Sequence, residues 1–461
     1  MVLLLLNLFD IWTLLAWTVC LFIFVHLCLF SDRYVAFPGL ISFVAAVELL
    51  LAPVLAASFP PSFHEYDMTL PLGAYLQYAT PATIALWIGL HWPVNRNLGT
   101  QMQWPQPSAL NPRLRWWMDV VLIGGVGLAT FAGGFPSSLF FLVTIVSSLR
   151  FFAALTWMIT RTPGWTFRVT VVIAQLLVIT SAYGIFYTLL QWTGFFLLIY
   201  GFRCRWRAKL GLALILALMS TVLLQYVKAD YRAYLRAENP NFVERLSTLG
   251  RIVVNQIAGS DQPVAMTFGD VLVRFNQGWI VSRIIDRVPR KVPFAKGSTI
   301  EDALLFTLLP RALFPNKPQG ASRVLFARFT GLQLNPSTSM GLSIIGEMYA
   351  NFGYFGGVLG TFVFGSLVGL AYACFAKLAH KSPHWWAAAP VVLLAAIEPA
   401  WNLEDISNYI VKSALVLFLL ASVVPAFREL LALKPIWSRK GSPSSVALSR
   451  ERAGFDLPRR Q

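Results

Sequence analysis

Long apolar runs dominate the chain and are separated by short polar segments. A helix needs about 20 predominantly apolar residues to cross the core of a bilayer, and eleven runs approach or exceed that length. They lie near residues 8–30, 36–59, 69–92, 116–133, 136–159, 167–184, 186–203, 209–226, 353–377, 385–402 and 408–428. The pattern predicts an all-α polytopic membrane protein with about 11 transmembrane helices. The first run has neither a basic start nor a small-residue cleavage site, so it is expected to be retained.

The composition agrees with this class. Hydrophobic residues make up 57% of the chain and charged residues only 13%, and the mean hydropathy is +0.63. About a quarter of the residues of a soluble domain are charged, so a soluble class is excluded. The net charge of +16 lies in short loops and the tail, which favours membrane topology over nucleic-acid binding. The four cysteines lie in or beside predicted spans, which argues against a disulfide framework or a cysteine metal site.

Basic residues occur in alternate loops. The opposite set of short loops contains Glu65, Asp67, Glu404 and Asp405 but no Lys or Arg. Because basic loops stay in the cytoplasm, this pattern predicts a cytoplasmic C-terminus and an outward-facing long loop. Four regions are expected: helices 1–8 in residues 1–226, a large helical loop in 227–340, helices 9–11 in 341–430, and a basic, disordered tail in 431–461.

The large loop is the most unusual part of the chain. Between Lys228 and Met340 it holds eleven Arg and four Lys against eight acidic residues. Arginine beside a bilayer is costly unless an anion meets it, so function is expected in this loop. Its patterning predicts an amphipathic helix, a helix stopped by Pro289, a helix that starts at a capping box, and a short helical piece. They are expected at 241–257, 267–288, 298–310 and around 323–328.

The cations of this loop form candidate contacts for an anion. Arg283 and Arg287 share a helix face with Asn276, while three prolines stiffen a turn that presents Arg311 and Lys317. A rigid turn with two cations suits a diphosphate, because guanidinium pairing needs fixed geometry. The alternative is that these cations lie along an interfacial helix or pair with acidic residues of the loop.

Glu347 is a lone acid in an apolar run at the start of a span. Partial burial would make it either a general base or the structural partner of a nearby arginine. Beyond it, glycines recur at four-residue spacing, as in Gly353 and Gly357 or Gly365 and Gly369. This spacing predicts close packing of helices in the bilayer.

Several motifs in residues 270–357 occur together. They are Arg274-Phe-Asn-Gln, the proline and glycine block at 288–299, Leu309-Pro-Arg311-Ala-Leu-Phe-Pro-Asn-Lys317-Pro, and Glu347-x-Tyr349-x-Asn351-Phe-Gly353. With the plan of many spans and one large outer loop, they resemble the bacterial oligosaccharide repeat-unit polymerases, the Wzy-type O-antigen and exopolysaccharide polymerases.

The resemblance implies a GT-C-like fold and glycosyl transfer that uses no metal or cofactor, on the periplasmic face of the bacterial inner membrane. The growing glycan on undecaprenyl diphosphate would be the donor, and a new lipid-linked repeat unit would be the acceptor. A chain-length regulator and a flippase are the expected protein partners.

The expected site combines catalytic and substrate-binding residues. Arg274 and Arg311 match family motifs and would hold the diphosphate, and Glu347 is the candidate catalytic base. The expected substrate-binding residues are Arg283, Arg287, Lys317, Arg323, Arg328, Asn276, Tyr349 and Asn351. No pair of aspartates in the loop has the character of a metal site.

Two other functions stay open. An O-antigen ligase of the same fold would differ in its acceptor, and the absence of His between 228 and 340 favours the polymerase. A lipid-linked sugar transporter or flippase would place charges at mid-bilayer on several helices, whereas here nearly all charges lie in loops.

Overall fold

The computed structural model describes most of the chain, and every regular element in that part is a helix. The described residues are 10–31, 35–59, 64–98, 110–183, 187–204, 209–220, 242–258, 268–308, 321–335, 340–398 and 400–432, with single positions at 222, 231 and 234. Each of the eleven predicted apolar runs overlaps a helix.

The helices before the large loop are α2 (Ile11–Phe30), α3 (Phe37–Ala46), the π-helix η1 (Val47–Leu51), α4 (Ala52–Ser58), η2 (His64–Tyr66), α5 (Leu72–Leu98), α6 (Pro112–Thr130), η3 (Ala132–Gly134), α7 (Ser137–Thr160), α8 (Trp165–Tyr183), α9 (Tyr187–Cys204) and an apolar helix at Lys209–Ser220. Those within and after it are α11 (Phe242–Ala258), α12 (Phe268–Val273), α13 (Gly278–Arg287), α14 (Ser298–Leu308), α15 (Ala321–Thr330), α16 (Ile344–Ala379), α17 (Trp385–Leu393), η4 (Leu394–Ile397), α18 (Leu403–Val423) and α19 (Pro425–Leu430).

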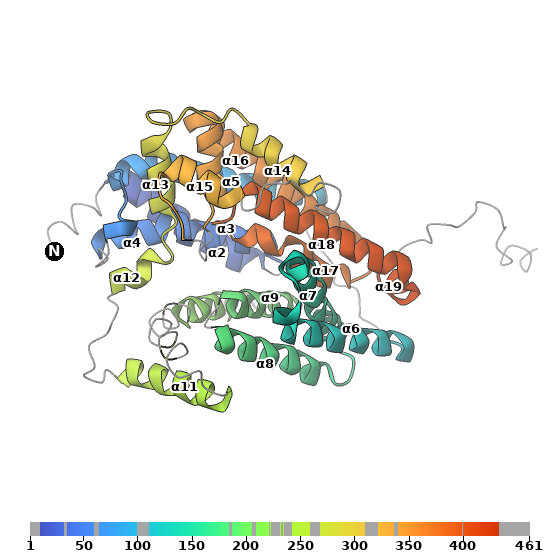
Figure 1. The fold of residues 1–461 in the computed structure, drawn as a ribbon. Coiled ribbons are helices and arrows are strands. Elements are labelled where there is room, and N and C mark those ends of the chain that lie inside the picture. Colours follow the sequence, from blue (N-terminus) through green and yellow to red (C-terminus); the bar gives the residue numbers. More distant parts are fainter. Residues whose placement is uncertain are drawn as a thin grey trace, which may run out of the picture.

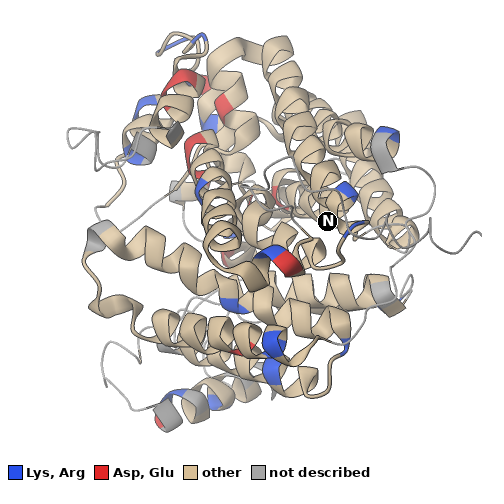
Figure 2. Cartoon of the chain, turned by 90° about the vertical axis from the view of Figure 1, so that its right-hand side faces the viewer, with Lys and Arg blue, Asp and Glu red and all other residues tan. Residues whose placement is uncertain are grey.

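The chain is an α-helical membrane protein. In the described part, five helices are long and apolar enough to cross a bilayer: Ile11–Phe30, Phe37–Ser58, Leu139–Thr160, Ile344–Ala379 and Leu403–Val423. Three shorter apolar helices accompany them, at Trp165–Ser181, Lys209–Ser220 and Trp385–Ile397. Figure 2 shows long stretches of helix without a charged residue, as expected for surfaces that face lipid.

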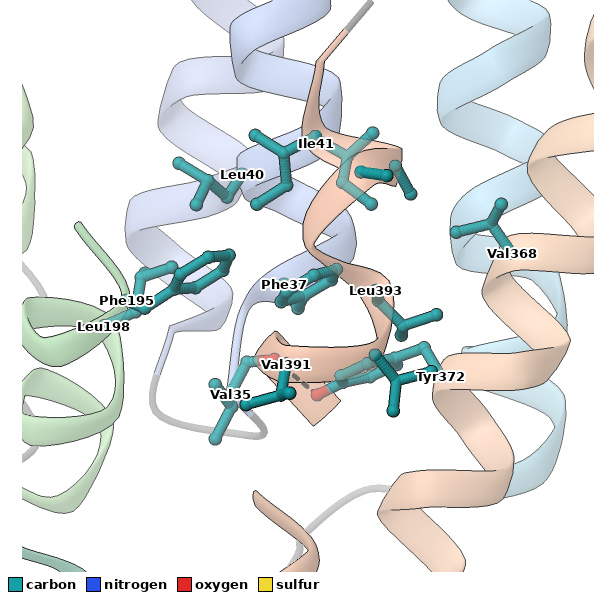
Figure 3. Close-up of a cluster of buried hydrophobic side chains, with 14 of the residues drawn as sticks. Val35, Phe37, Leu40, Ile41, Phe195, Leu198, Val368, Tyr372, Val391 and Leu393 are labelled. Atoms are coloured by element: carbon teal, nitrogen blue, oxygen red, sulfur yellow. Dashed lines mark hydrogen bonds between the residues drawn. The ribbon is translucent and has the colours of Figure 1, made fainter. Parts of the chain in front are cut away.

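The helices form two groups (Figure 1). Helices α2–α5 lie with α13–α16 and α18 in one group, and α6, α8 and α9 lie with α11 in the other. Helix α17 contacts α16 of the first group and α7, which packs against α6 and α8 of the second, so it joins the two groups. A buried cluster reinforces this junction: Phe37 of α3 stacks between Phe195 of α9, at a centroid distance of 5.3 Å, and Tyr372 of α16, at 6.0 Å (Figure 3).

Glycines let α5 and α16 pack closely, which confirms the prediction from their spacing. A Cβ atom on Gly365 would lie 2.8 Å from the carbonyl oxygen of Leu86, and Gly369 meets the backbone of Leu90 in the same way. Only glycine fits where two helix backbones approach this closely.

The predicted start of α16 at residue 353 is wrong, because the helix begins at Ile344. Gly353 interrupts it with φ +71° and ψ −158°, a conformation that glycine adopts readily. The ring of Phe294 lies 3.1 Å from the position of a Cβ at Gly353, so a side chain there would have to displace the ring. The kink lies between the first turns of α16, which carry Glu347, and the remainder of the helix.

The helices predicted near 241–257, 298–310 and 323–328 are confirmed as α11, α14 and α15. The continuous helix predicted at 267–288 is wrong, since a turn at 274–277 separates α12 from α13. That turn docks on the π-helix, where the N–H of Gln277 donates to the carbonyl of Glu48 at 3.1 Å. Pro53 lacks an N–H that could donate to the Leu49 carbonyl, and the Tyr75 hydroxyl donates to that carbonyl instead at 2.7 Å.

Candidate functional site

A cavity of about 1110 Å³ lies where the large loop meets the transmembrane helices. The segments that line it come from the η2 turn, the start of α7, α12 with α13, residues 340–341, and residues 398–408. All of them belong to loops or helix ends that the charge pattern assigns to the outer face. The fold therefore brings these segments, distant in sequence, to one end of the bundle.

The α12–α13 junction supplies one polar wall. Arg274 and Gln277 lie in the turn, and Asp270 precedes them on α12 with 2% of its surface exposed. The N–H of Arg274 donates to the carbonyl of Val271 at 3.1 Å, which fixes the backbone of the turn. Docking on the π-helix holds this wall against the membrane domain.

A second polar wall follows η4 and contains Glu398, Asp405 and Asn408. Burial, and to a smaller degree the neighbouring Asp405 carboxyl, raises the pKa of the Glu398 carboxyl to about 8. A hydrogen bond with Trp401 acts in the opposite direction. A carboxyl with this pKa exchanges its proton near neutral pH, which suits a general acid or base.

Aromatic rings line the rest of the cavity: Tyr66, Phe140, Phe141, Trp279 and Trp401. Tyr66 meets Trp279 edge-on at 5.2 Å, and the ammonium group of Lys412 lies 4.8 Å from the Phe141 ring. Rings beside hydrogen-bonding groups fit a ligand that has both apolar faces and polar edges.

Glu347 is not among the residues that line the cavity. It lies at the junction of α14, α16 and α18. It is 1% exposed, and both of its carboxyl oxygens accept hydrogen bonds at 2.8 Å, one from the Thr299 hydroxyl and one from the Leu403 N–H. Asn351 extends the network by donating to Thr299 at 2.7 Å and accepting from the Gly297 N–H at 2.9 Å. The carboxyl caps the first turn of α18 and ties it to α14.

Of the other predicted site residues in the described part, only Arg274 lines the cavity. Asn276 is buried beside it. The Arg283 guanidinium lies 5.9 Å from the Trp279 ring, outside the lining, and Tyr349 packs edge-on against Tyr78 at 4.9 Å.

The remaining predicted cations lie on other surfaces. Arg287 donates to the carbonyl of Arg328 at 3.2 Å, which links α13 to α15. The side chains of Arg323 and Arg328 are exposed. Arg311 and Lys317 lie outside the described residues, as does the proline-rich turn that carries them.

Neither Glu398 nor Asp405 was predicted as a site residue, since Glu398 falls within the apolar run at 385–402 and Asp405 in the short loop that follows it. The structure places both in the cavity wall instead. The available signal was topological, since the end of that run and the loop after it are predicted on the same face as the large loop.

No group of three His, Cys, Asp or Glu side chains that could hold a metal ion occurs among the described residues. Comparisons with protein-family models, with curated proteins and with solved structures found no match for the chain.

Proposed function

We propose that this protein is a membrane glycosyltransferase that polymerises undecaprenyl-diphosphate-linked repeat units on the periplasmic face of the bacterial inner membrane. The observation that carries the proposal is the shared cavity of Arg274, Glu398 and Asp405, walled by aromatic rings. Such a cavity combines a cation for a diphosphate, a carboxyl for proton transfer and surfaces for a sugar ring. The GT-C-like fold, about 11 spans and a cytoplasmic tail belong to the same proposal.

The chemistry assigns separate roles to the two polar walls. Glu398 takes the proton of an acceptor hydroxyl, whose oxygen forms a new bond to the anomeric carbon of the donor. The bond between that carbon and the diphosphate oxygen breaks, and its electron pair leaves with the diphosphate. Arg274 stabilises the charge that develops there, because a fixed guanidinium needs no reorganisation during the reaction.

Other loop residues retain the roles that the family resemblance implies. Arg311 is proposed as a second contact to the diphosphate, and Lys317 and the surface arginines as contacts along the glycan or lipid headgroup. Glu347 is the exception, because both of its oxygens already accept hydrogen bonds. We assign it the role of positioning α18, which carries Asp405, rather than that of the base.

The test uses purified protein in nanodiscs with lipid-linked repeat units, a chelator and no added metal. A ladder of lengthening lipid-linked glycans is the expected product. Transfer of glycan only to a separately added acceptor lipid would indicate the ligase. Movement of the intact substrate across a vesicle membrane without any new glycosidic bond would indicate a transporter and overturn the proposal.

A further inference from the structure

A second cavity, of about 300 Å³, lies at the end of the bundle that closes without the large loop. Helices α16, α17, α18 and α19 form it, and each of them packs against the next. Among the described side chains that line it, only those of Trp385, Ser422 and Arg428 carry polar atoms, and none is a carboxyl. This cavity is therefore apolar with one cation, unlike the larger one.

The polar atoms gather at one end of this cavity. Its lining residues on α18 run from Ala414 to Ser422, so it extends for roughly 12 Å along that helix at a rise of about 1.5 Å per residue. Ser422 lies in the last turn of α18, and Arg428 belongs to α19, which follows. The indole N–H of Trp385 donates to the carbonyl of Leu431 at 3.1 Å at the same end. The cavity is thus apolar along its length and cationic at one end.

The cavity opens onto the surface of a membrane-spanning helix. Helices α16 and α18 are both long and apolar enough to cross a bilayer. The Phe418 side chain, which lines the cavity, is 57% exposed, and Leu419 and Val423 on the same helix are exposed as well. Because lipid is the solvent of such a surface, the molecule that meets the cavity there is an acyl chain.

Arg428 has donors left for an anion. Its Nη2 donates to the carbonyl of Ser422 at 2.6 Å and its Nε to that of Ala421 at 3.4 Å, which turns the guanidinium back onto the end of α18. A guanidinium has five N–H donors. Nη1 makes no hydrogen bond with any described residue and is not enclosed by protein. The adjacent Glu429 carboxyl accepts from the Asn111 amide at 3.4 Å. Nη1 is therefore available for a phosphate oxygen.

We propose that this cavity binds one phospholipid whose headgroup has a net negative charge, with an acyl chain along α18 and the phosphate at Arg428. A lipid tail matches the apolar wall, and a guanidinium held by two backbone carbonyls pairs well with a phosphate. Trp385 lies at the polar end, and tryptophan favours the interface between membrane and water. The inference is independent of the proposed glycosyl transfer, because it involves neither the substrate nor the larger cavity.

A photoreactive side chain in the cavity tests the inference on the full chain. A benzophenone side chain would replace that of Phe418 in protein embedded in nanodiscs of phosphatidylglycerol and phosphatidylcholine, supplied equally and with identical acyl chains. After irradiation, mass spectrometry would identify the adducts. Phosphatidylglycerol adducts are expected to be about fivefold more abundant, the factor that one basic residue near an anionic lipid contributes.

A second probe position provides the matched control. Leu419 is 50% exposed, lies beside Phe418 on α18 and does not line the cavity. The same benzophenone at Leu419 should label the two lipids nearly in the ratio in which they were supplied. The comparison separates a bound lipid from the lipid that surrounds every membrane-spanning helix.

Substitutions at the cationic end then assign the preference. In the protein with the probe at Phe418, Arg428→Gln should reduce the lipid ratio to that seen at Leu419. Arg428→Lys keeps the charge and should retain most of the preference. Lys381→Gln removes an exposed cation from the turn between α16 and α17 and should leave the ratio unchanged. Size-exclusion profiles would show that the variants remain folded.

Three results would overturn the inference. They are equal labelling of the two lipids at Phe418, a preference that survives Arg428→Gln, and a cross-link from position 418 to a peptide of residues 433–461. The last result would show that the C-terminal segment of the chain fills the cavity. None of them concerns glycosyl transfer, which the polymerisation assay tests separately.

Discussion

The two ends of the helical bundle differ in what their polar groups do. At the end that closes without the large loop, loops hydrogen-bond to one another: Leu110 donates to the Thr162 hydroxyl at 3.0 Å, and the Ser382 hydroxyl donates to the Leu430 carbonyl at 2.6 Å. At the other end, the carboxyl side chains of Asp270, Glu398 and Asp405 line a cavity together with Arg274. Loops that hydrogen-bond to one another hold a structure together, whereas charged side chains gathered around a cavity indicate a ligand.

Removing the cation from the cavity is expected to have the largest effect. Arg274→Ala should lower kcat by about 10²–10³-fold, the usual loss when one preorganised group that stabilises developing charge is removed. The measurement is the initial rate of repeat-unit polymerisation. Lys291→Ala removes an exposed cation of the same loop and should retain wild-type turnover. Equal rates for the Arg274 variant and wild type would refute the assigned role.

Glu398→Gln is expected to reduce kcat by about 10²-fold, because proton transfer to a positioned base contributes at least that much. In the wild type the rate should rise with pH through about 8 as Glu398 loses its proton. Asp405→Asn should move this inflection to lower pH, since Asp405 raises the pKa of Glu398. An unchanged inflection in both variants would exclude Glu398 as the base.

Breaking the hydrogen-bond network of Thr299, Glu347 and Asn351 should lower the stability of the protein. Thr299→Val leaves the Glu347 carboxyl without one of its donors and should lower the free energy of unfolding by about 1–3 kcal/mol. Thermal unfolding of the detergent-solubilised protein would report the loss, with the exposed Lys291→Ala as control. An unchanged midpoint for Thr299→Val would mean that the network does not hold α14 to α18.

The smallest effect on stability and turnover is expected at the end of the bundle opposite the cavity. The Arg168 guanidinium contacts Asp119 through two hydrogen bonds of 2.6 and 2.7 Å, on side chains that are 24% and 31% exposed. A double-mutant cycle with Arg168→Ala and Asp119→Ala should give a coupling of about 0.2–1 kcal/mol, as for other partly exposed pairs. Turnover should be unchanged, and a loss comparable to that of Arg274→Ala would remove the contrast between the two ends.

The sequence allows the elements to be predicted better than their assembly. Apolar runs, the capping box at Ser298 and helical periodicity in the loop each correspond to a helix, because those signals are local. The break between α12 and α13 depends on Gln277 meeting the Glu48 carbonyl, a contact between distant segments. No local pattern contains that information.

The same limit applies to the candidate site. Arg274 could be selected because it lies in one of the loop motifs, but the Glu398 and Asp405 carboxyls that share its cavity are encoded more than a hundred residues later. Glu347 looked reactive because it is isolated in sequence, yet one of its donors is the backbone N–H of Leu403. A backbone donor leaves no trace in the pattern of side chains.

The glycan is predicted to bind in the cavity lined by Arg274, Glu398 and Asp405. A lipid-linked repeat unit with a diazirine on the sugar next to the diphosphate, irradiated on the nanodisc-embedded protein, would test it most directly by peptide mapping. Cross-links are predicted within residues 268–280 and 398–408. Cross-links confined to the end that carries Ser382 and Leu430, or to α11, would contradict the account.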